Sequence, residues 1–170
     1  MKKSRLTEAM RNVRNGDTQE QLAMELNVSR ELISKIENGR VEMAPDISRK
    51  LMKRKGSPRL AMALRYEYTG TGTTLLNGPN VDLHRSSVRE KTIEEAEEFL
   101  TAIKACSFAK PLTSLSNWER PNLEKTLEEG VELITAIEHY LLIACEESGL
   151  DLVNVWQNHH TQLRAKGYVQ

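Results

Sequence analysis

Residues 18–40 read TQEQLAMELNVSRELISKIENGR, and this stretch decides the fold of the N-terminal part of the chain. Its apolar residues recur at helical spacing in two blocks, which are separated by a short turn at residues 27–29. Thr18 and Gln21 have the spacing of a capping box, and Gly39 suits the left-handed position that ends a helix. The stretch therefore predicts two short amphipathic helices joined by a tight turn.

The second of these helices has a buried side and a polar outer side. Leu32, Ile33 and Ile36 supply the apolar side. The residues left on the other side are Ser29, Arg30, Glu31, Ser34, Lys35 and Asn38. Such groups hydrogen-bond to base edges and phosphates, and only a helix or a paired ribbon fits the major groove of DNA. The pattern therefore predicts a helix that reads DNA.

The segment resembles the phage-repressor (Xre-like) helix-turn-helix family through TQEQLA, the turn NVS and ISKIENGR. The resemblance covers about the first 65 residues, a span typical of a small domain. It implies a five-helix DNA-binding domain, and the sequence predicts helices at 5–14, 18–26, 29–38, 46–53 and 58–66. The alternative is a helical hairpin inside some other all-α protein.

The resemblance also implies roles for the matching positions. Arg30, Glu31 and Lys35 would face base edges, because Arg and Lys suit guanine acceptors and a carboxylate accepts from the cytosine amino group. Gln19 would bind a phosphate and brace the recognition helix, and Asn38 and Arg40 would hold phosphate beyond the end of that helix. The complete predicted DNA-binding set is Gln19, Ser29, Arg30, Glu31, Ser34, Lys35, Asn38 and Arg40. The alternative for each is a solvated helix face, and Glu31 can instead pair with Lys35 at i,i+4.

The charge of the chain is unevenly distributed although its formal net charge is zero. Through Thr69 there are fifteen Lys or Arg against nine Asp or Glu, and from Gly70 onward nine against fifteen. A basic front half of this kind is typical of a polyanion-binding region. The run at residues 49–55 adds to the excess, either as a solvated helix end or as a group that follows a phosphate backbone.

The rest of the chain predicts a linker and a helical domain. Residues 68–74 are rich in Gly and Thr, so we place domain boundaries at 1–68, a linker or crossing segment at 69–91, and a helical domain at 92–170. Three helices are expected there, at 92–108 with a capping box of Thr92 and Glu95, at 122–148, and from Asp151 onward. The fold class is therefore all-α.

These three helices carry more apolar surface than they can bury among themselves, which is typical of a partner surface. Helix-turn-helix proteins commonly bind DNA as twofold dimers, so we expect the back half to dimerise. The predicted dimerisation residues are Leu127, Val131, Ile134, Tyr140, Leu141 and Trp156. The alternative is that the back half packs onto the front as one core.

Two acidic patterns raise the possibility of an enzyme. Glu94, Glu95 and Glu98 form one EExxE pattern, and residues 128–132 contain another. Carboxylates at this spacing share a helical face and can hold Mg²⁺ for nucleotide pyrophosphate cleavage. Residues 134–153 also resemble helices of the all-α (MazG-like) pyrophosphatases, but the positions of that family's second acidic pair read Leu133 and Ala136. A solvated acidic face explains the glutamates, so we expect no enzyme.

These observations together predict a DNA-binding transcriptional regulator, of the type of a phage or mobile-element repressor, that binds a palindromic operator as a homodimer. The alternative is an adaptor or antitoxin whose acidic back half captures a protein partner. We expect no catalytic residue, no metal ligand and no cofactor. Without a signal peptide or an apolar run of about 20 residues, we expect a soluble, cytoplasmic protein with no membrane partner.

Overall fold

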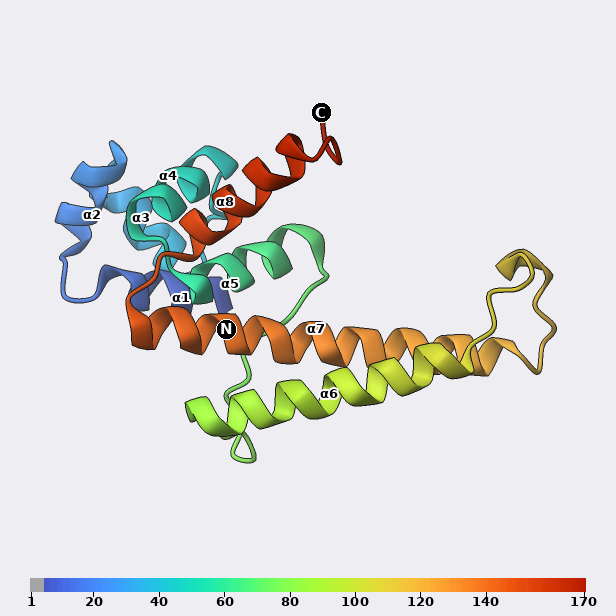
Figure 1. Cartoon of the computed structure of the whole chain (residues 1–170). Helices are drawn as coiled ribbons and strands as arrows, with labels where there is room; N and C mark the ends of the chain where they lie inside the picture. Colours follow the sequence, from blue (N-terminus) through green and yellow to red (C-terminus); the bar gives the residue numbers. More distant parts are fainter. Residues whose placement is uncertain (1–4) are drawn as a thin grey trace. The chain divides into compact units, whose positions relative to one another are not determined.

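A computed structural model describes residues 5–170, and its regular elements are all helical, which confirms the all-α prediction (Figure 1). The described residues contain no strand. The α-helices are α1 Arg5–Arg14, α2 Gln19–Leu26, α3 Arg30–Glu37, α4 Pro45–Lys55, α5 Pro58–Thr69, α6 Arg85–Ala105, α7 Arg120–Ser148 and α8 Leu152–Ala165. A short 3₁₀ turn, η1, covers Leu112–Ser114. No described helix is both long and apolar enough to cross a bilayer.

The chain divides into two compact units. The first contains the residues up to Leu75 together with Ser148–Gln170, and the second is Leu76–Glu147. The C-terminal helix α8 thus groups with the front of the chain, whereas the sequence placed it in the back domain. The division into a DNA-binding domain, a crossing segment and a dimerisation domain stays a prediction.

The first unit is built around a core that α1 to α5 share. Its fully buried side chains are Met10, Leu22, Leu26, Ile33, Ile36, Leu51 and Leu60. The predicted capping box at the start of α2 is confirmed, because Gln21 N donates to Thr18 Oγ1 at 3.1 Å and Thr18 N donates to Gln21 Oε1 at 2.7 Å. Asn27 ends α2 at φ 54°, a left-handed conformation that Asn tolerates. The turn can therefore bring α3 across α2.

The end of α4 lies against the start of α8 within this unit. Gly56 ends α4 at φ +55°, and a Cβ built on it would come 2.9 Å from Asp151 Oδ1. That oxygen accepts a hydrogen bond from Val153 N at 2.8 Å, so the carboxyl group is held at the N-cap of α8. Only Leu152 of α8 is buried, so this junction is one of few points that fix the helix.

Gly56→Ala is expected to lower the free energy of unfolding by about 2 kcal/mol, because a left-handed alanine is strained and its methyl group displaces Asp151. Gly70→Ala is the matched control, since Gly70 also ends a helix at φ +64° but a Cβ there would meet nothing within 4 Å. We expect about 1 kcal/mol for Gly70→Ala from the backbone strain alone. Urea denaturation measures both values, and equal losses would show that Asp151 does not press on Gly56.

The second unit is a hairpin of two antiparallel helices, α6 and α7, joined by a loop (Figure 1). The helices approach closely where side chains are small. Thr126 Oγ1 donates to Ala102 O at 3.4 Å, and a Cβ on Gly130 would lie 3.1 Å from the Phe99 ring. The two helices are therefore in close contact at Ala102 and at Gly130.

Helix α6 begins seven residues earlier than the sequence predicted. Its N-cap is His84, and Thr92 lies inside the helix, where Thr92 Oγ1 donates to Val88 O at 2.8 Å. The predicted capping box of Thr92 and Glu95 is therefore wrong. Residues 85–91 contain neither Gly nor Pro, so nothing in them stops the helix from extending to His84.

The apolar stripes of the two helices face outward in the single chain. On α6, Ile93, Leu100 and Ile103 are exposed. On α7, Leu127 is 61% exposed and Val131 is 62% exposed. The buried side chains of these helices are Val88 and Glu95 of α6 and Thr126, His139, Leu142, Ile143 and Cys145 of α7, so three of the seven are polar. One carboxylate, Glu95, is thus buried while several apolar side chains of the same two helices are exposed, and a self-sufficient hairpin would favour the opposite.

Candidate functional site

Helix α3 presents a polar surface to solvent. Ser29 is its N-cap, and Leu32 N donates to Ser29 Oγ at 3.2 Å. Arg30, Glu31 and Lys35 are exposed, while Ile33 and Ile36 on the opposite side are buried. The side chains that the sequence predicted to face base edges are therefore grouped on one exposed face.

A buried carboxylate fixes the end of α3 to the two helices before it. Glu37 is only 3% exposed, and its Oε1 lies 2.6 Å from Arg14 Nε. Gln19 Nε2 donates to Glu37 Oε2 at 2.6 Å, and Arg11 Nη2 donates to the Glu37 backbone oxygen at 2.8 Å. Because charge-assisted bonds of this kind are the strong ones, they hold the exposed face of α3 in a fixed orientation.

The sequence analysis did not identify Glu37, Arg11 or Arg14 as site residues. The sequence did contain a signal for Glu37. It lies four residues after Ile33 and directly after Ile36, so helical spacing places it on the buried side of the helix. A carboxylate at a buried position requires a cationic partner. Sequence spacing could not indicate that the partner would come from α1.

Two predicted phosphate contacts already have partners within the domain. The Gln19 amide is bound to Glu37, which agrees with its predicted bracing role. Asn38 Nδ2 donates to Ser34 O at 2.8 Å, and Asn38 Oδ1 accepts from Arg11 Nη2 at 3.1 Å. Arg40 is exposed. Arg40 is thus available to contact a phosphate.

Glu31 stays ionised at the start of α3. Hydrogen bonds from its own backbone N–H and from the Ser29 hydroxyl lower its pKa, and the charges of Arg30 and Lys35 lower that pKa further. Among the described residues, no ion pair joins Glu31 to Lys35. The i,i+4 alternative for Glu31 therefore has no direct contact to support it.

The basic run on α4 contributes unequally to the surface. Arg49, Lys50, Lys53 and Arg54 are exposed. Lys55 instead lies 2.5 Å from Asp17 Oδ2 and 3.3 Å from Glu25 Oε2, and the hydrogen bond to Asp17 raises its pKa. Lys55 therefore stabilises the domain, and the other four residues supply the positive surface.

Comparison with known families identifies this first unit. Residues 8–54 match the family described as helix-turn-helix. These residues form a helix-turn-helix domain. The chain thus has a DNA-binding domain of the kind found in transcription regulators. No curated protein and no solved structure matches the chain.

The match begins inside α1 and ends inside α4, so it covers the helix-turn-helix and includes no residue of the hairpin in the second unit. The predicted dimerisation residues are placed unequally: Leu127, Val131, Ile134 and Tyr140 are exposed on α7, and Leu141 is half-buried. Trp156 is 50% exposed but belongs to the first unit with α8.

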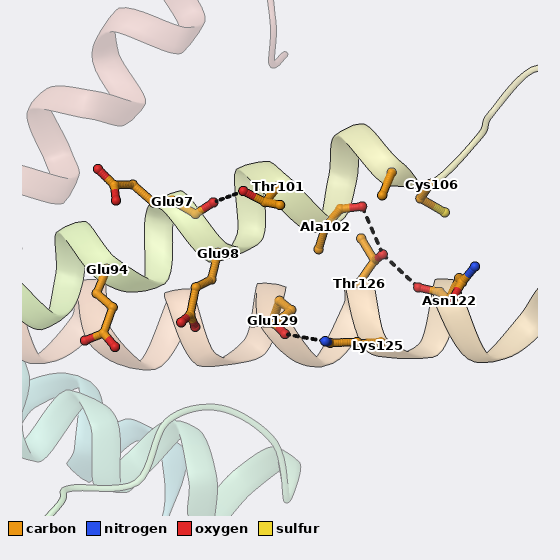
Figure 2. A pocket seen from close by; sticks show the side chains of 11 residues that line it. Glu94, Glu97, Glu98, Thr101, Ala102, Cys106, Asn122, Lys125, Thr126 and Glu129 are labelled. Atoms are coloured by element: carbon orange, nitrogen blue, oxygen red, sulfur yellow. Dashed lines mark hydrogen bonds and ion pairs between the residues drawn. The ribbon is translucent and has the colours of Figure 1, made fainter.

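A group of four carboxylates occupies the middle of the α6–α7 hairpin, and we call it the carboxylate cluster. It consists of Glu95 and Glu98 of α6 and of Glu129 and Glu132 of α7. One carboxylate oxygen from each residue lies within 4.8 Å of the others. Figure 2 shows Glu98 directed from α6 toward α7, where Glu129 lies beside Lys125. The sequence analysis predicted no metal ligand here. It aligned the second acidic pair of the MazG-like family with Leu133 and Ala136, which are not acidic.

Proposed function

We propose that this protein is a sequence-specific transcription regulator that inserts α3 into the major groove of its operator. The observation that supports this most directly is the exposed face of Arg30, Glu31 and Lys35 on a helix that the Glu37 network braces. Arg30 and Lys35 would bond to guanine acceptors, and Glu31 would accept from a cytosine amino group. The protein would act in the cytoplasm, where the DNA is.

Phosphate contacts would supply affinity and position α3 in the groove. The exposed cations Arg40, Arg49, Lys50 and Arg54 suit this role. We assign Gln19 and Asn38 to bracing, because their amide groups already bond to Glu37 and to Ser34 and Arg11. Ser29, the exposed N-cap of α3, and the half-buried Ser34 would contact the DNA backbone.

The functional form would be a homodimer that uses the outward apolar face of the hairpin. This face includes Ile93, Leu100 and Ile103 of α6 and Leu127, Val131, Ile134 and Tyr140 of α7. Two such hairpins would bury the face by forming a four-helix bundle with a twofold axis. A twofold dimer places two recognition helices on half-sites about one helical turn apart, so the operator would be palindromic.

Repression by occlusion of a promoter is the simplest mode of action for a dimer bound to its operator. A phage or mobile-element repressor acts in this way. The adaptor or antitoxin alternative would use the same apolar face for another protein. Selection of bound sequences from random DNA, with the mass of the protein measured in parallel, tests both points. Recovery of a palindrome by a dimer supports the proposal, and a protein that co-purifies on this face supports the alternative.

Lys35→Ala is expected to weaken operator binding by about 1–3 kcal/mol and to relax the preference at one base position. The reason is that an exposed Lys35 can reach a guanine edge only if α3 lies in the groove. Competition binding against operators with single base changes measures the effect. Lys104→Ala is the matched control, since it removes the same charge from α6. A uniform loss on all sequences would show that Lys35 contacts only the backbone.

The carboxylate cluster favours a second candidate function for the hairpin, namely Mg²⁺-dependent cleavage of nucleotide pyrophosphate bonds. The supporting observation is that two helices bring four carboxylates together, which the sequence alone did not indicate. A bound cation would polarise the phosphate and activate the attacking water. Release of pyrophosphate from nucleoside triphosphates in Mg²⁺, lost on Glu95→Gln and retained on Glu128→Gln, would support it.

A further inference from the structure

A cavity of about 370 Å³ lies between residues 76–83, which precede α6, and the two helices of the hairpin. All of its lining residues belong to the second unit. Its volume is at the lower end of the range found for small-molecule sites. The apolar part of its lining consists of Leu76, Val81, Leu83, Val88 and Ala136. The cavity therefore suits the apolar part of a small organic ligand.

One carboxylate in the wall of this cavity is buried and only partly satisfied. Glu95 lines the cavity and is only 6% exposed. Its Oε1 lies 2.8 Å from Lys91 Nζ, which also lies 3.1 Å from Glu94 Oε2. Glu95 Oε2 is buried and has no hydrogen-bond partner among the described residues. Buried acceptors without a partner are rare, so a ligand that donates to this oxygen would supply what the chain does not.

Two polar side chains of α7 in the cavity wall already have partners within the chain. His139 Nε2 accepts from Leu76 N at 3.1 Å, so the ring proton is on Nδ1, which donates to Thr135 O at 2.8 Å. Thr135 Oγ1 donates to Val131 O at 2.9 Å. These groups therefore leave no buried donor for a ligand, whereas Glu95 offers a buried acceptor.

The lining of the cavity carries an excess of negative charge. Its carboxylates are Asp82, Glu95 and Glu132, and Lys91 is the one lysine or arginine among the lining residues. In the part of the chain that the structure describes, Glu132 forms no ion pair. Unlike charges attract and like charges repel, so the cavity favours a cationic ligand over a phosphate or a carboxylate.

From this arrangement we infer that the cavity binds a small organic amine, with the ammonium group on Glu95 Oε2 and the apolar body against the aliphatic lining. An ammonium group donates hydrogen bonds and carries the charge that the lining lacks, and charge-assisted bonds of this kind are the strong ones. The ligand would also contact Leu76 and Val81, so it would hold residues 76–83 against the hairpin. The inference requires no metal, no phosphate and no DNA, so it rests on neither proposed function.

Binding of phenethylamine to the full chain tests this inference, with phenethyl alcohol as an uncharged analogue of similar shape. The titrations are carried out in EDTA and followed by the amide resonances of isotopically labelled protein. We expect saturable shifts centred on Val81, Val88 and Ala136, which line the cavity. The amine should bind about tenfold more tightly than the alcohol or better, because only the amine forms a charged hydrogen bond with Glu95.

Three variants locate the site. Glu95→Gln keeps the shape of the side chain but removes its charge, so the amine should bind it no more tightly than the alcohol does. Glu94→Gln is the matched control, because Glu94 pairs with the same lysine but does not line the cavity, and it should bind as the wild type does. Val81→Phe would fill the cavity, so it should bind neither compound, and it decides the question if Glu95→Gln does not fold.

Four results would overturn the inference. They are the lack of saturable shifts at the cavity, an alcohol that binds as tightly as the amine, equal amine affinity in Glu95→Gln and Glu94→Gln, and a folded Val81→Phe that binds like the wild type. Operator binding and nucleotide cleavage, measured on the same samples without the amine, report on the two proposed functions separately.

Discussion

Arg14→Ala is expected to destabilise the helix-turn-helix domain by about 3 kcal/mol, the largest loss of stability that we predict for a single substitution. Arg14 Nε lies 2.6 Å from Glu37 Oε1, and the Arg14 side chain is only 25% exposed. Its removal leaves the buried Glu37 carboxylate with the Gln19 amide as its remaining side-chain donor. An uncompensated buried charge is what makes the loss of one partner so costly. Urea denaturation of the full chain measures the effect.

The double variant Arg14→Met with Glu37→Met is the control for this prediction. Replacing both partners by apolar side chains of similar size removes the charge together with its partner, so most of the stability should return. Operator binding should not return fully, because the bonds that orient α3 against Gln19 are gone. If Arg14→Ala is as stable as the wild type, the Glu37 network does not hold the domain together.

Leu127→Glu combined with Val131→Glu is expected to convert the protein to a monomer and to lower operator affinity about a hundredfold or more. Both side chains are more than 60% exposed in the single chain, at 61% and 62%, so the substitutions should not disturb the fold of the hairpin. Charges placed in a buried apolar interface lose hydration without gaining partners, which separates the protomers. A monomer then binds one half-site and loses the gain from simultaneous contact with two.

Sedimentation and operator binding measure the two parts of this prediction. Trp118→Glu is the control, because Trp118 is 76% exposed but lies in the loop outside α6 and α7. It should leave mass and affinity unchanged. A doubly substituted protein that remains dimeric would place the interface elsewhere. A monomeric wild type with full operator affinity would refute the dimer altogether.

The recognition face could be predicted from the sequence because its information is local. Caps, turn residues and apolar spacing within residues 18–40 determine where α2 and α3 begin and end and which side of each is buried. The exposed positions of Arg30 and Lys35 follow from those choices. The bracing of Glu37 by Arg14 could not be predicted, since it depends on how α1 crosses α3.

The start of α6 shows how local signals can mislead. Thr92 and Glu95 have the spacing of a capping box, yet the helix continues back to His84 and buries Glu95 instead. The spacing of a capping box does not by itself show that a helix begins there. A Thr inside a helix can also donate to the carbonyl group four residues before it, as Thr92 does to Val88. The pairing of α6 with α7 is what buries Glu95.

The sequence by itself determined that the chain is helical, where the helix-turn-helix lies, and which of its residues meet solvent. These properties follow from interactions between residues that are close in sequence, because residues three and four positions apart lie on the same face of a helix. Only the tertiary structure decided that Glu95 and Glu98 meet Glu129 and Glu132, and that the apolar stripes of the hairpin face outward. The reason is that the register between two helices depends on close contacts such as that of Phe99 with Gly130, which no spacing within one helix encodes.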